Sequence, residues 1–147
     1  MNLIIHTDGG ARGNPGPAAV GVVIEEGSGV REQGTGNVLA AFGKRIGETT
    51  NNVAEYTAVI EALKYLGNRV QGVGYREHVK SIDFFLDSTL VVNQLNGLFR
   101  VKELHLRELL LRVRELEGVV GGEIHYHVIP REQNKRADFL VNQALDE

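Results

Sequence analysis

The order of strand-like and helix-like segments constrains the fold of this chain more than any other feature of its sequence. Three apolar, β-branched stretches precede the first helical pattern, and the two patterns then alternate toward the end. Strands joined by short turns pair antiparallel, whereas strands separated by a helix can pair in parallel. The sequence therefore predicts an α/β fold with a mixed sheet covered by helices. The expected strands are residues 2–7, 18–25, about 30–46, 79–86 and 123–129.

Apolar residues at helical spacing predict four helices. The first begins near Asn51 or Asn52, and the others cover 88–96, 102–117 and the segment from Pro130 to about residue 144. Glycine-rich residues 8–17 predict a turn, and residues 68–78 predict a polar connection. The first helix should bury Tyr56, Val59, Ile60, Leu63 and Leu66, and the last should bury Ala137, Leu140, Val141 and Ala144.

The composition limits the classes of site that the chain can build. At 147 residues we expect one domain over residues 1–147, without a membrane span. The absence of cysteine excludes disulfides and thiolate metal sites and favours a cytoplasmic location. The net charge of −3 means that any phosphate-binding surface must be local.

Four acidic residues stand out because each lies at the end of a different expected element: Asp8, Glu55, Asp87 and Asp138. Asp8 and Asp87 follow apolar strands, where ligand sites of α/β sheets usually form. If the four meet, they form an oxygen-only site that suits magnesium or manganese. Each residue also has a structural alternative: a turn before glycine for Asp8, a capping box for Glu55, a helix N-cap for Asp87 and a solvated rim for Asp138.

Two polar segments favour contact with a phosphate backbone. Glycines in residues 9–17 allow another backbone to approach closely. The segment 49–52 (Thr-Thr-Asn-Asn) opens a helix with side-chain donors and free N–H groups, which suit a phosphate. Ordinary N-capping is the alternative, and it needs only one of those side chains.

Four motifs together resemble type 1 ribonuclease H. They are Thr7 to Pro17, Thr49 to Glu55, Asp87-Ser88, and Pro130 to Asp138, in the order and spacing of that family. The chain is most similar to compact prokaryotic members that lack a basic protrusion. The resemblance implies a five-stranded mixed sheet in the order 3-2-1-4-5 and endonucleolytic cleavage of the RNA strand in an RNA–DNA hybrid.

The resemblance also implies the residues of the site. Asp8, Glu55, Asp87 and Asp138 would bind two Mg²⁺ ions when substrate is present, with Mn²⁺ as a substitute. We also expect a monomer with no obligate protein partner. The residues expected to contact the hybrid are Gly9, Gly10, Asn14, Thr50, Asn51, Asn52 and Asn134.

Three departures from the family pattern bear on function. Arg131 stands where many members carry a catalytic histidine, and we expect it to take over part of that role. Thr89 replaces a usual glutamine, and residues 100–114, with five cations, become the only obvious basic surface. Two other functions stay open: a non-catalytic hybrid-binding module, and a nuclease of the same fold that also cleaves double-stranded RNA.

Overall fold

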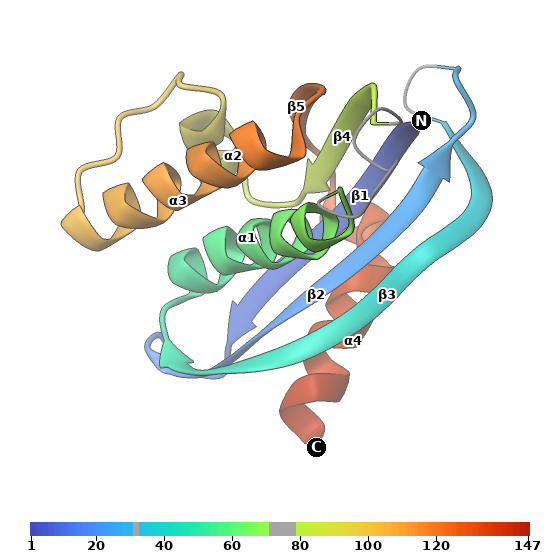
Figure 1. Cartoon of the computed structure of the whole chain (residues 1–147). Helices are drawn as coiled ribbons and strands as arrows, with labels where there is room; N and C mark the ends of the chain where they lie inside the picture. Colours follow the sequence, from blue (N-terminus) through green and yellow to red (C-terminus); the bar gives the residue numbers. More distant parts are fainter. Residues whose placement is uncertain (31–32, 71–78) are drawn as a thin grey trace.

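One mixed five-stranded sheet in the order β3-β2-β1-β4-β5 organises the protein (Figure 1). This computed structural model describes residues 1–30, 33–70 and 79–147. β1 pairs antiparallel with β2, β2 pairs antiparallel with β3, and the pairs β1–β4 and β4–β5 are parallel. The sheet confirms the expected mixed topology. Its strands are β1 (Asn2–Ala11), β2 (Gly16–Gly27), β3 (Gly34–Thr49), β4 (Ser81–Leu86) and β5 (Glu123–Val128).

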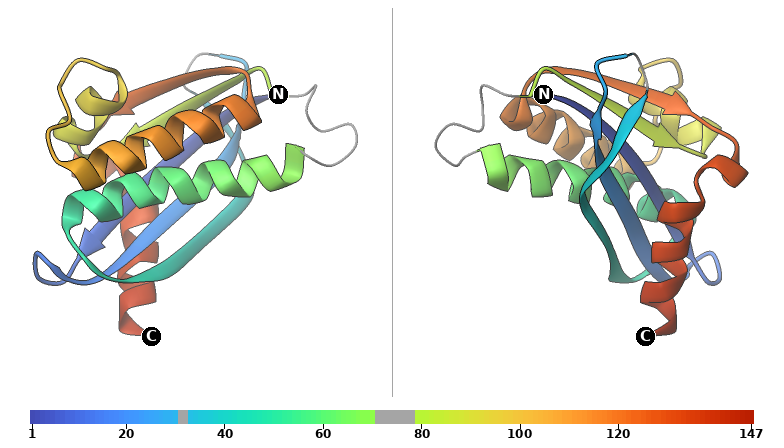
Figure 2. Two further views of the ribbon diagram at one scale, coloured as in Figure 1. Left: turned by 60° about the vertical axis from the view of Figure 1, so that its left-hand side comes forward. Right: turned by 90° about the vertical axis from the view of Figure 1, so that its right-hand side faces the viewer.

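Helices cover both faces of the sheet. α1 and α3 lie side by side on one face, and α4 crosses the other face (Figure 2). Within the described residues, no helix is long and apolar enough to cross a membrane. The helices are α1 (Asn51–Val70), α2 (Thr89–Leu95), α3 (Leu104–Val120) and α4 (Lys135–Asp146), with a short 3-10 helix, η1 (Arg131–Gln133), before α4.

The main core lies between the sheet and the α1–α3 layer. All five residues predicted for the apolar side of α1 are buried, as are Leu106, Val113 and Leu116 of α3. On α4, Ala137, Val141 and Ala144 are buried, whereas Leu140 is only half-buried. Helical periodicity therefore identified the buried face of each long helix, although Leu109 and Leu110 of α3, like Leu140, lie at its edge and are only half-buried.

Two glycines let α4 lie directly on the antiparallel part of the sheet. A Cβ atom at Gly21 would overlap the carbonyl oxygen of Ala137, and one at Gly43 would overlap that of Leu140. Gly43 lies within β3 at the place where the helix needs room. This close packing fixes the position of α4, whose first turn carries Asp138.

Several element ends differ from the sequence prediction. β1 continues through Gly9 and Gly10 to Ala11, and β2 already begins at Gly16, so a turn over 8–17 was wrong for residues 8–11 and 16–17. α1 extends to Val70, beyond the predicted start of the polar connection. The rest of that connection, residues 71–78, lies outside the described residues.

Candidate active site

The end of the parallel β1–β4 ladder positions two of the acidic residues. The last parallel pair is His6 with Phe85. Asp8 lies two residues further along β1, and Asp87 directly follows the last residue of β4. Both carboxylates therefore leave the sheet at the carboxyl ends of neighbouring parallel strands, as the sequence predicted. Asp8 differs from the expectation in one respect, because it lies inside a longer strand.

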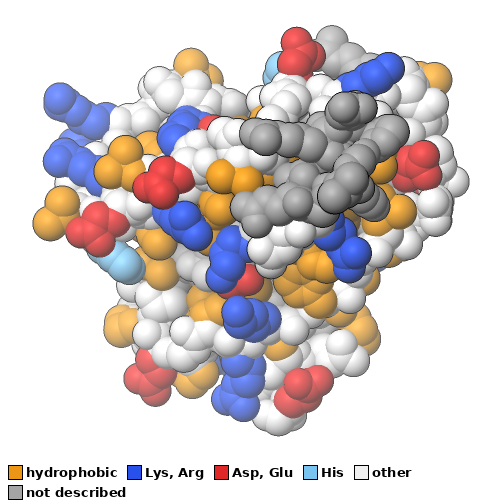
Figure 3. All heavy atoms as spheres, viewed as in Figure 1, with side chains coloured by type: hydrophobic (Ala, Val, Ile, Leu, Met, Phe, Trp, Pro, Cys, Tyr) orange, Lys and Arg blue, Asp and Glu red, His pale blue; other side chains and the backbone are white. Residues whose placement is uncertain are grey.

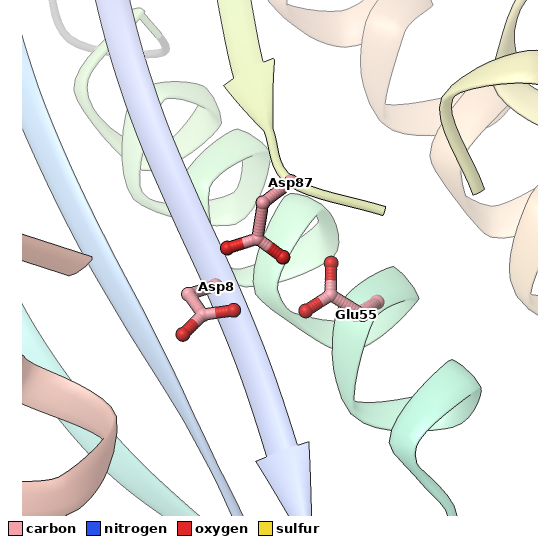
Figure 4. Close-up of side chains that lie close together, drawn as sticks. All are labelled: Asp8, Glu55 and Asp87. Atoms are coloured by element: carbon pink, nitrogen blue, oxygen red, sulfur yellow. The ribbon is translucent and has the colours of Figure 1, made fainter. Parts of the chain in front are cut away.

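Three of the four predicted carboxylates converge (Figure 4). One oxygen each from Asp8, Glu55 and Asp87 lie within 4.8 Å of one another. Asp8 is 7% exposed and Glu55 is 6% exposed, while Asp87 is half-buried. Asp138 is not part of this group, but it lines the same cleft from the first turn of α4. The structure therefore gathers three carboxylates in a tight cluster and places the fourth at its rim.

Burial and mutual repulsion hold protons on this cluster. Burial is the main cause that raises the pKa of Asp8 from 3.8 to about 7. A hydrogen bond with Glu55 opposes that rise in pKa, and the charges of Asp87 and Asp138 add to it. The pKa of Glu55 is raised well above its usual value, first by burial and then by the charge of Asp8. Such a site is unfavourable as a set of bare anions and gains from a bound cation.

Local structure excludes the alternative roles of three acidic residues. Among the described residues, no backbone N–H at the start of α1 donates to Glu55, and Oγ1 of Thr50 accepts from the N–H of Val53 at 3.3 Å instead. The N-cap of α2 is Ser88, not Asp87, since the Ser88 side chain accepts from the N–H of Val91. Asp8 is paired within β1 and forms no turn. Capping and turn formation therefore do not explain why Asp8, Glu55 and Asp87 stand at these positions, whereas their convergence in one cluster does.

The donor set fits a hard divalent cation. All three converging ligands are carboxylates, and oxygen ligands suit Mg²⁺ or Mn²⁺. The N–H of Gly9 donates to Oε1 of Glu55 at 2.9 Å. The other oxygen, Oε2, is buried without a hydrogen-bond partner among the described residues. A buried carboxylate oxygen without a donor is well suited to coordinate a cation.

An open cleft of about 400 Å³ gives access to the cluster. Besides the four acidic residues, Gly10 and Asn52 line it. Two arginines, Arg12 and Arg131, also border the cleft. Arg131 lies in η1 and is exposed. Arg131 lines the same cleft as the four acidic residues.

The asparagines predicted to contact substrate join the β1–β2 loop to the start of α1. Oδ1 of Asn14 accepts from the N–H of Asn51 at 3.0 Å. Oδ1 of Asn51 accepts from the N–H of Ala11 at 2.9 Å. Thr50 caps the same helix. These residues hold the loop against the helix N-terminus, so a ligand meets a prearranged surface there.

Asn134, also predicted to contact substrate, is 1% exposed. Its Nδ2 donates to the carbonyl oxygen of Thr7 at 2.9 Å and to Oδ2 of Asp87 at 3.2 Å. A side chain so deeply buried has no surface for a nucleic acid. Sequence reasoning missed this inward role, and the only available signal was the position of Asn134 one helical turn before Asp138.

The basic segment 100–114 is smaller than its five cations suggested. Nε of Arg107 donates to the carbonyl oxygen of Val101, Arg112 pairs with a glutamate at 3.4 Å, and Arg114 pairs with another at 3.0 Å. Arg100 and Lys102 are exposed and make no such contact with any residue that the structure describes. Lys and Arg side chains gather beside the start of α3 (Figure 3). The free part of the basic surface is therefore the loop before α3.

Relatives with known names share the full extent of this chain. A family model described as "Reverse transcriptase-like" matches residues 6–144. "Ribonuclease HI" of Halobacterium salinarum is 40% identical over 97% of this chain, which spans 63% of that protein. "Ribonuclease H" of Methylococcus capsulatus is 33% identical over 97% of this chain and 88% of its own length. A "Bifunctional protein" of Mycobacterium tuberculosis is 37% identical, and the chain spans only 36% of it.

Solved structures agree with this assignment. LC11-RNase H1, crystallised in complex with an RNA/DNA hybrid, is 42% identical with a TM-score of 0.84 over 98% of this chain and 96% of that chain. RNase H1 from Halobacterium salinarum is 37% identical with a TM-score of 0.83 over 99% of this chain and 98% of that chain. Sequence and fold match these enzymes from end to end. The chain therefore belongs to the type 1 ribonuclease H family.

Proposed function

We propose that this protein is a divalent-cation-dependent endonuclease that hydrolyses the RNA strand of RNA–DNA hybrids. The convergence of Asp8, Glu55 and Asp87 in an open cleft carries this proposal, because a buried trio of carboxylates is costly without bound cations. Membership of the ribonuclease H family supports it. A relative that was crystallised with an RNA/DNA hybrid supports the choice of substrate.

The acidic residues would hold two cations when substrate is present. Asp8, Glu55 and Asp87 supply the oxygens that already converge, and Asp138 would complete the second position from the rim. Mg²⁺ is the expected ion and Mn²⁺ a substitute, from the oxygen-only donor set. When bound, such a pair supplies Lewis-acid stabilisation of the attacking and leaving oxygens of a phosphodiester.

Other residues of the cleft would bind and orient the RNA strand. The N–H of Gly9 is already used by Glu55, so direct contact with the ribose 2′-hydroxyl falls to Gly10 and Asn52, which line the cleft. Arg131 would hold the phosphate beside the cleavage position as a permanently charged donor. Because guanidinium does not lose its proton, Arg131 positions the phosphate and takes no part as a base.

The DNA strand would dock at the N-terminus of α1. Asn14, Thr50 and Asn51 form a connected polar surface there, and a helix N-terminus favours a phosphate. Contacts of this kind fix the register of a nucleic acid without reading its sequence. This surface is joined to the acidic cluster through β1 and α1, so the DNA contact and the cleavage position are held in a fixed relationship.

A direct test compares labelled RNA–DNA hybrid, RNA duplex and DNA duplex, each with Mg²⁺ and with excess chelator. We expect cleavage of the hybrid's RNA strand only when Mg²⁺ is present. Binding of the hybrid without any cleavage would instead support a hybrid-binding module. That module is disfavoured because four carboxylates facing a polyanion would weaken binding. Cleavage of the RNA duplex would add a second activity.

Three further expectations accompany this function. We propose that residues 1–147 act as one catalytic domain. The monomeric state and the cytoplasmic location expected from the sequence stay predictions.

A further inference from the structure

Asn134 connects three elements of the acidic site from inside the protein. Its amide donates to the carbonyl oxygen of Thr7, the residue before Asp8 in β1, and to Oδ2 of Asp87. Its backbone carbonyl accepts from the N–H of Asp138 at 3.1 Å, in the first turn of α4. Its backbone N–H donates to the carbonyl oxygen of Arg131 at 3.0 Å, which closes η1. Asn134 thus forms a hydrogen bond with Asp87, Asp138 and Arg131, and with Thr7 next to Asp8. Glu55 is the one predicted catalytic residue that it does not reach in this way.

We propose that Asn134 is a positioning residue that orients the Asp87 carboxylate and thereby sets the affinity of the site for divalent cations. The inference rests on the metal site of the proposed function and assigns no contact with substrate to Asn134. The amide occupies Oδ2 of Asp87 with one hydrogen bond. The Asp87 carboxylate is therefore held in one direction while it still contributes an oxygen to the cluster with Asp8 and Glu55.

The same arrangement occurs a second time in the site. The N–H of Gly9 takes Oε1 of Glu55 and leaves Oε2 without a partner among the described residues. In both pairs, a neutral donor fixes one carboxylate oxygen and leaves the negative charge in place. A lysine or arginine in either position would neutralise that charge, and cation binding would weaken. Outer donors of this kind orient metal-binding carboxylates, and their loss typically costs about 10- to 100-fold in metal affinity.

The burial of Asn134 makes this orientation rigid. The residue is 1% exposed, and its amide is anchored by Thr7 of β1 as well as by Asp87. A surface asparagine would exchange such bonds with water. Because Thr7 belongs to β1, the central strand of the sheet, the hydrogen bond ties the Asn134 amide to the middle of the sheet. The same amide therefore links the direction of the Asp87 carboxylate to β1.

The test measures binding of Mn²⁺ alone, without nucleic acid, by titration calorimetry on the full chain. Asn134→Ala removes the donor, and Asn134→Asp keeps the size but replaces the donor with a repelling carboxylate. Val113→Ala is the control for general loss of stability, because Val113 is fully buried in the α1–α3 layer and away from the cleft. Melting in chelator confirms that all variants are folded at the titration temperature.

We expect both Asn134 variants to bind Mn²⁺ about 10- to 100-fold more weakly than the wild type. Val113→Ala should bind Mn²⁺ as the wild type does, even if it melts at a similarly lowered temperature. Unchanged Mn²⁺ affinity in both Asn134 variants would overturn the proposal, and so would tighter binding by Asn134→Asp, which would make position 134 a ligand position. If neither Asn134 variant is folded, Asn134→Ser, which keeps a hydroxyl donor, is titrated in the same way and judged by the same criterion.

The outcome is independent of whether the proposed substrate is correct. A wild-type protein that binds Mn²⁺ but leaves the hybrid uncut would contradict the proposed function, while the comparison of Mn²⁺ affinities would still decide the role of Asn134. As a second measurement, the Mg²⁺ concentration for half-maximal cleavage should rise in Asn134→Ala. A merely structural defect would lower the amount of active enzyme without that rise.

Discussion

The backbone N–H of Gly9 donates to Oε1 of Glu55 at 2.9 Å, and this bond joins β1 to α1 at the centre of the acidic cluster. The contact is so close that a Cβ atom on residue 9 would overlap the backbone of Ala54 and lie 2.6 Å from the nitrogen of Glu55. The sequence assigned Gly9 to substrate contact. The structure shows that residue 9 must be glycine because α1 lies so close to β1.

Gly9→Ala should destabilise the protein and abolish cleavage, because α1 must move away from β1 and carry Glu55 with it. Overpacking of this kind typically lowers the free energy of unfolding by about 1–3 kcal/mol. Gly10→Ala is the matched control, since its Cβ would meet only Cγ1 of Val141 at an ordinary 3.7 Å. Chemical denaturation measures both variants. An equal loss of stability in the two would refute the close-packing argument.

Asp87→Asn should remove cleavage while the protein stays folded and still binds the hybrid. Asparagine keeps the size of aspartate but lacks the charge that holds a cation. Because Ser88 is the N-cap of α2, the substitution disturbs no cap. In chelator, the melting temperature should stay the same or rise, since one of several repelling carboxylates is removed. A cleavage assay in Mg²⁺ beside melting in chelator tests this, and near-normal cleavage would remove Asp87 from the catalytic set.

The stability of the metal-free protein should fall as pH rises. The folded-state pKa of Asp8 is about 7, above the 3.8 of an exposed aspartate, mainly through burial. A raised carboxyl pKa means that the folded state binds the extra proton, so this contribution is full below about pH 4 and is lost by about pH 7. The Asp8→Asn variant lacks this titrating carboxyl group. In chelator, the stability advantage of Asp8→Asn over wild type should therefore grow from pH 4 to pH 7 and then level off.

That comparison removes the pH-dependent contributions that the two proteins share, whereas the titration of Glu55, whose pKa the charge of Asp8 raises, changes with the substitution. Burial lowers the pKa of His6, with a smaller effect from Arg136, and this contribution has the opposite sign. It is common to both proteins and cancels in the difference. Saturating Mg²⁺ should flatten the difference for the wild type, because a bound cation keeps the carboxylates charged in the folded state. A difference that does not vary with pH in chelator would contradict the raised pKa.

Arg131→Ala should slow cleavage without abolishing it and should leave Mn²⁺ affinity unchanged. The side chain is exposed at the border of the cleft and can steady a phosphate, but it holds no cation. We expect a smaller loss in kcat than the roughly 10²–10³-fold that removal of one transition-state donor costs. Arg131→Lys should recover part of the rate, because it keeps the charge. A loss as large as that of Asp87→Asn, or none, would show that this ranking is wrong.

Replacing both Arg100 and Lys102 by Ala should flatten the salt dependence of hybrid binding. For duplex DNA, each phosphate that a protein no longer neutralises reduces the slope of log K against log salt by about 0.9. Arg112→Ala is the control, because Arg112 already pairs with Glu115 on the same helix. Fluorescence anisotropy across a salt series, with a catalytically inactive Asp87→Asn background, measures the slopes. An unchanged slope in the double variant would show that this loop does not touch the hybrid.

Much of the fold was readable from the sequence because it depends on local pattern. Alternating and helical spacing of apolar residues gave the strands and the buried sides of α1 and α3, and the order of elements gave a mixed sheet. The acidic motifs gave the family, since their residue types and spacing are written in the chain. Asp8 and Asp87 were expected at neighbouring strand ends. Both lie just beyond the parallel ladder, which stops at His6 and Phe85, although Asp8 lies inside the longer β1.

The tertiary structure decided what each of these residues does there. Asn134, Gly9 and Gly43 have roles set by partners that lie far away in the sequence: Thr7 and Asp87, the backbone of α1, and the backbone of α4. Arg107 is likewise bound to the carbonyl oxygen of Val101, and Arg112 is paired with Glu115, because the fold brings these groups together. Local pattern carries the preference of a segment for helix or strand, whereas burial, close approach and hydrogen bonding between distant segments exist only once the chain has packed.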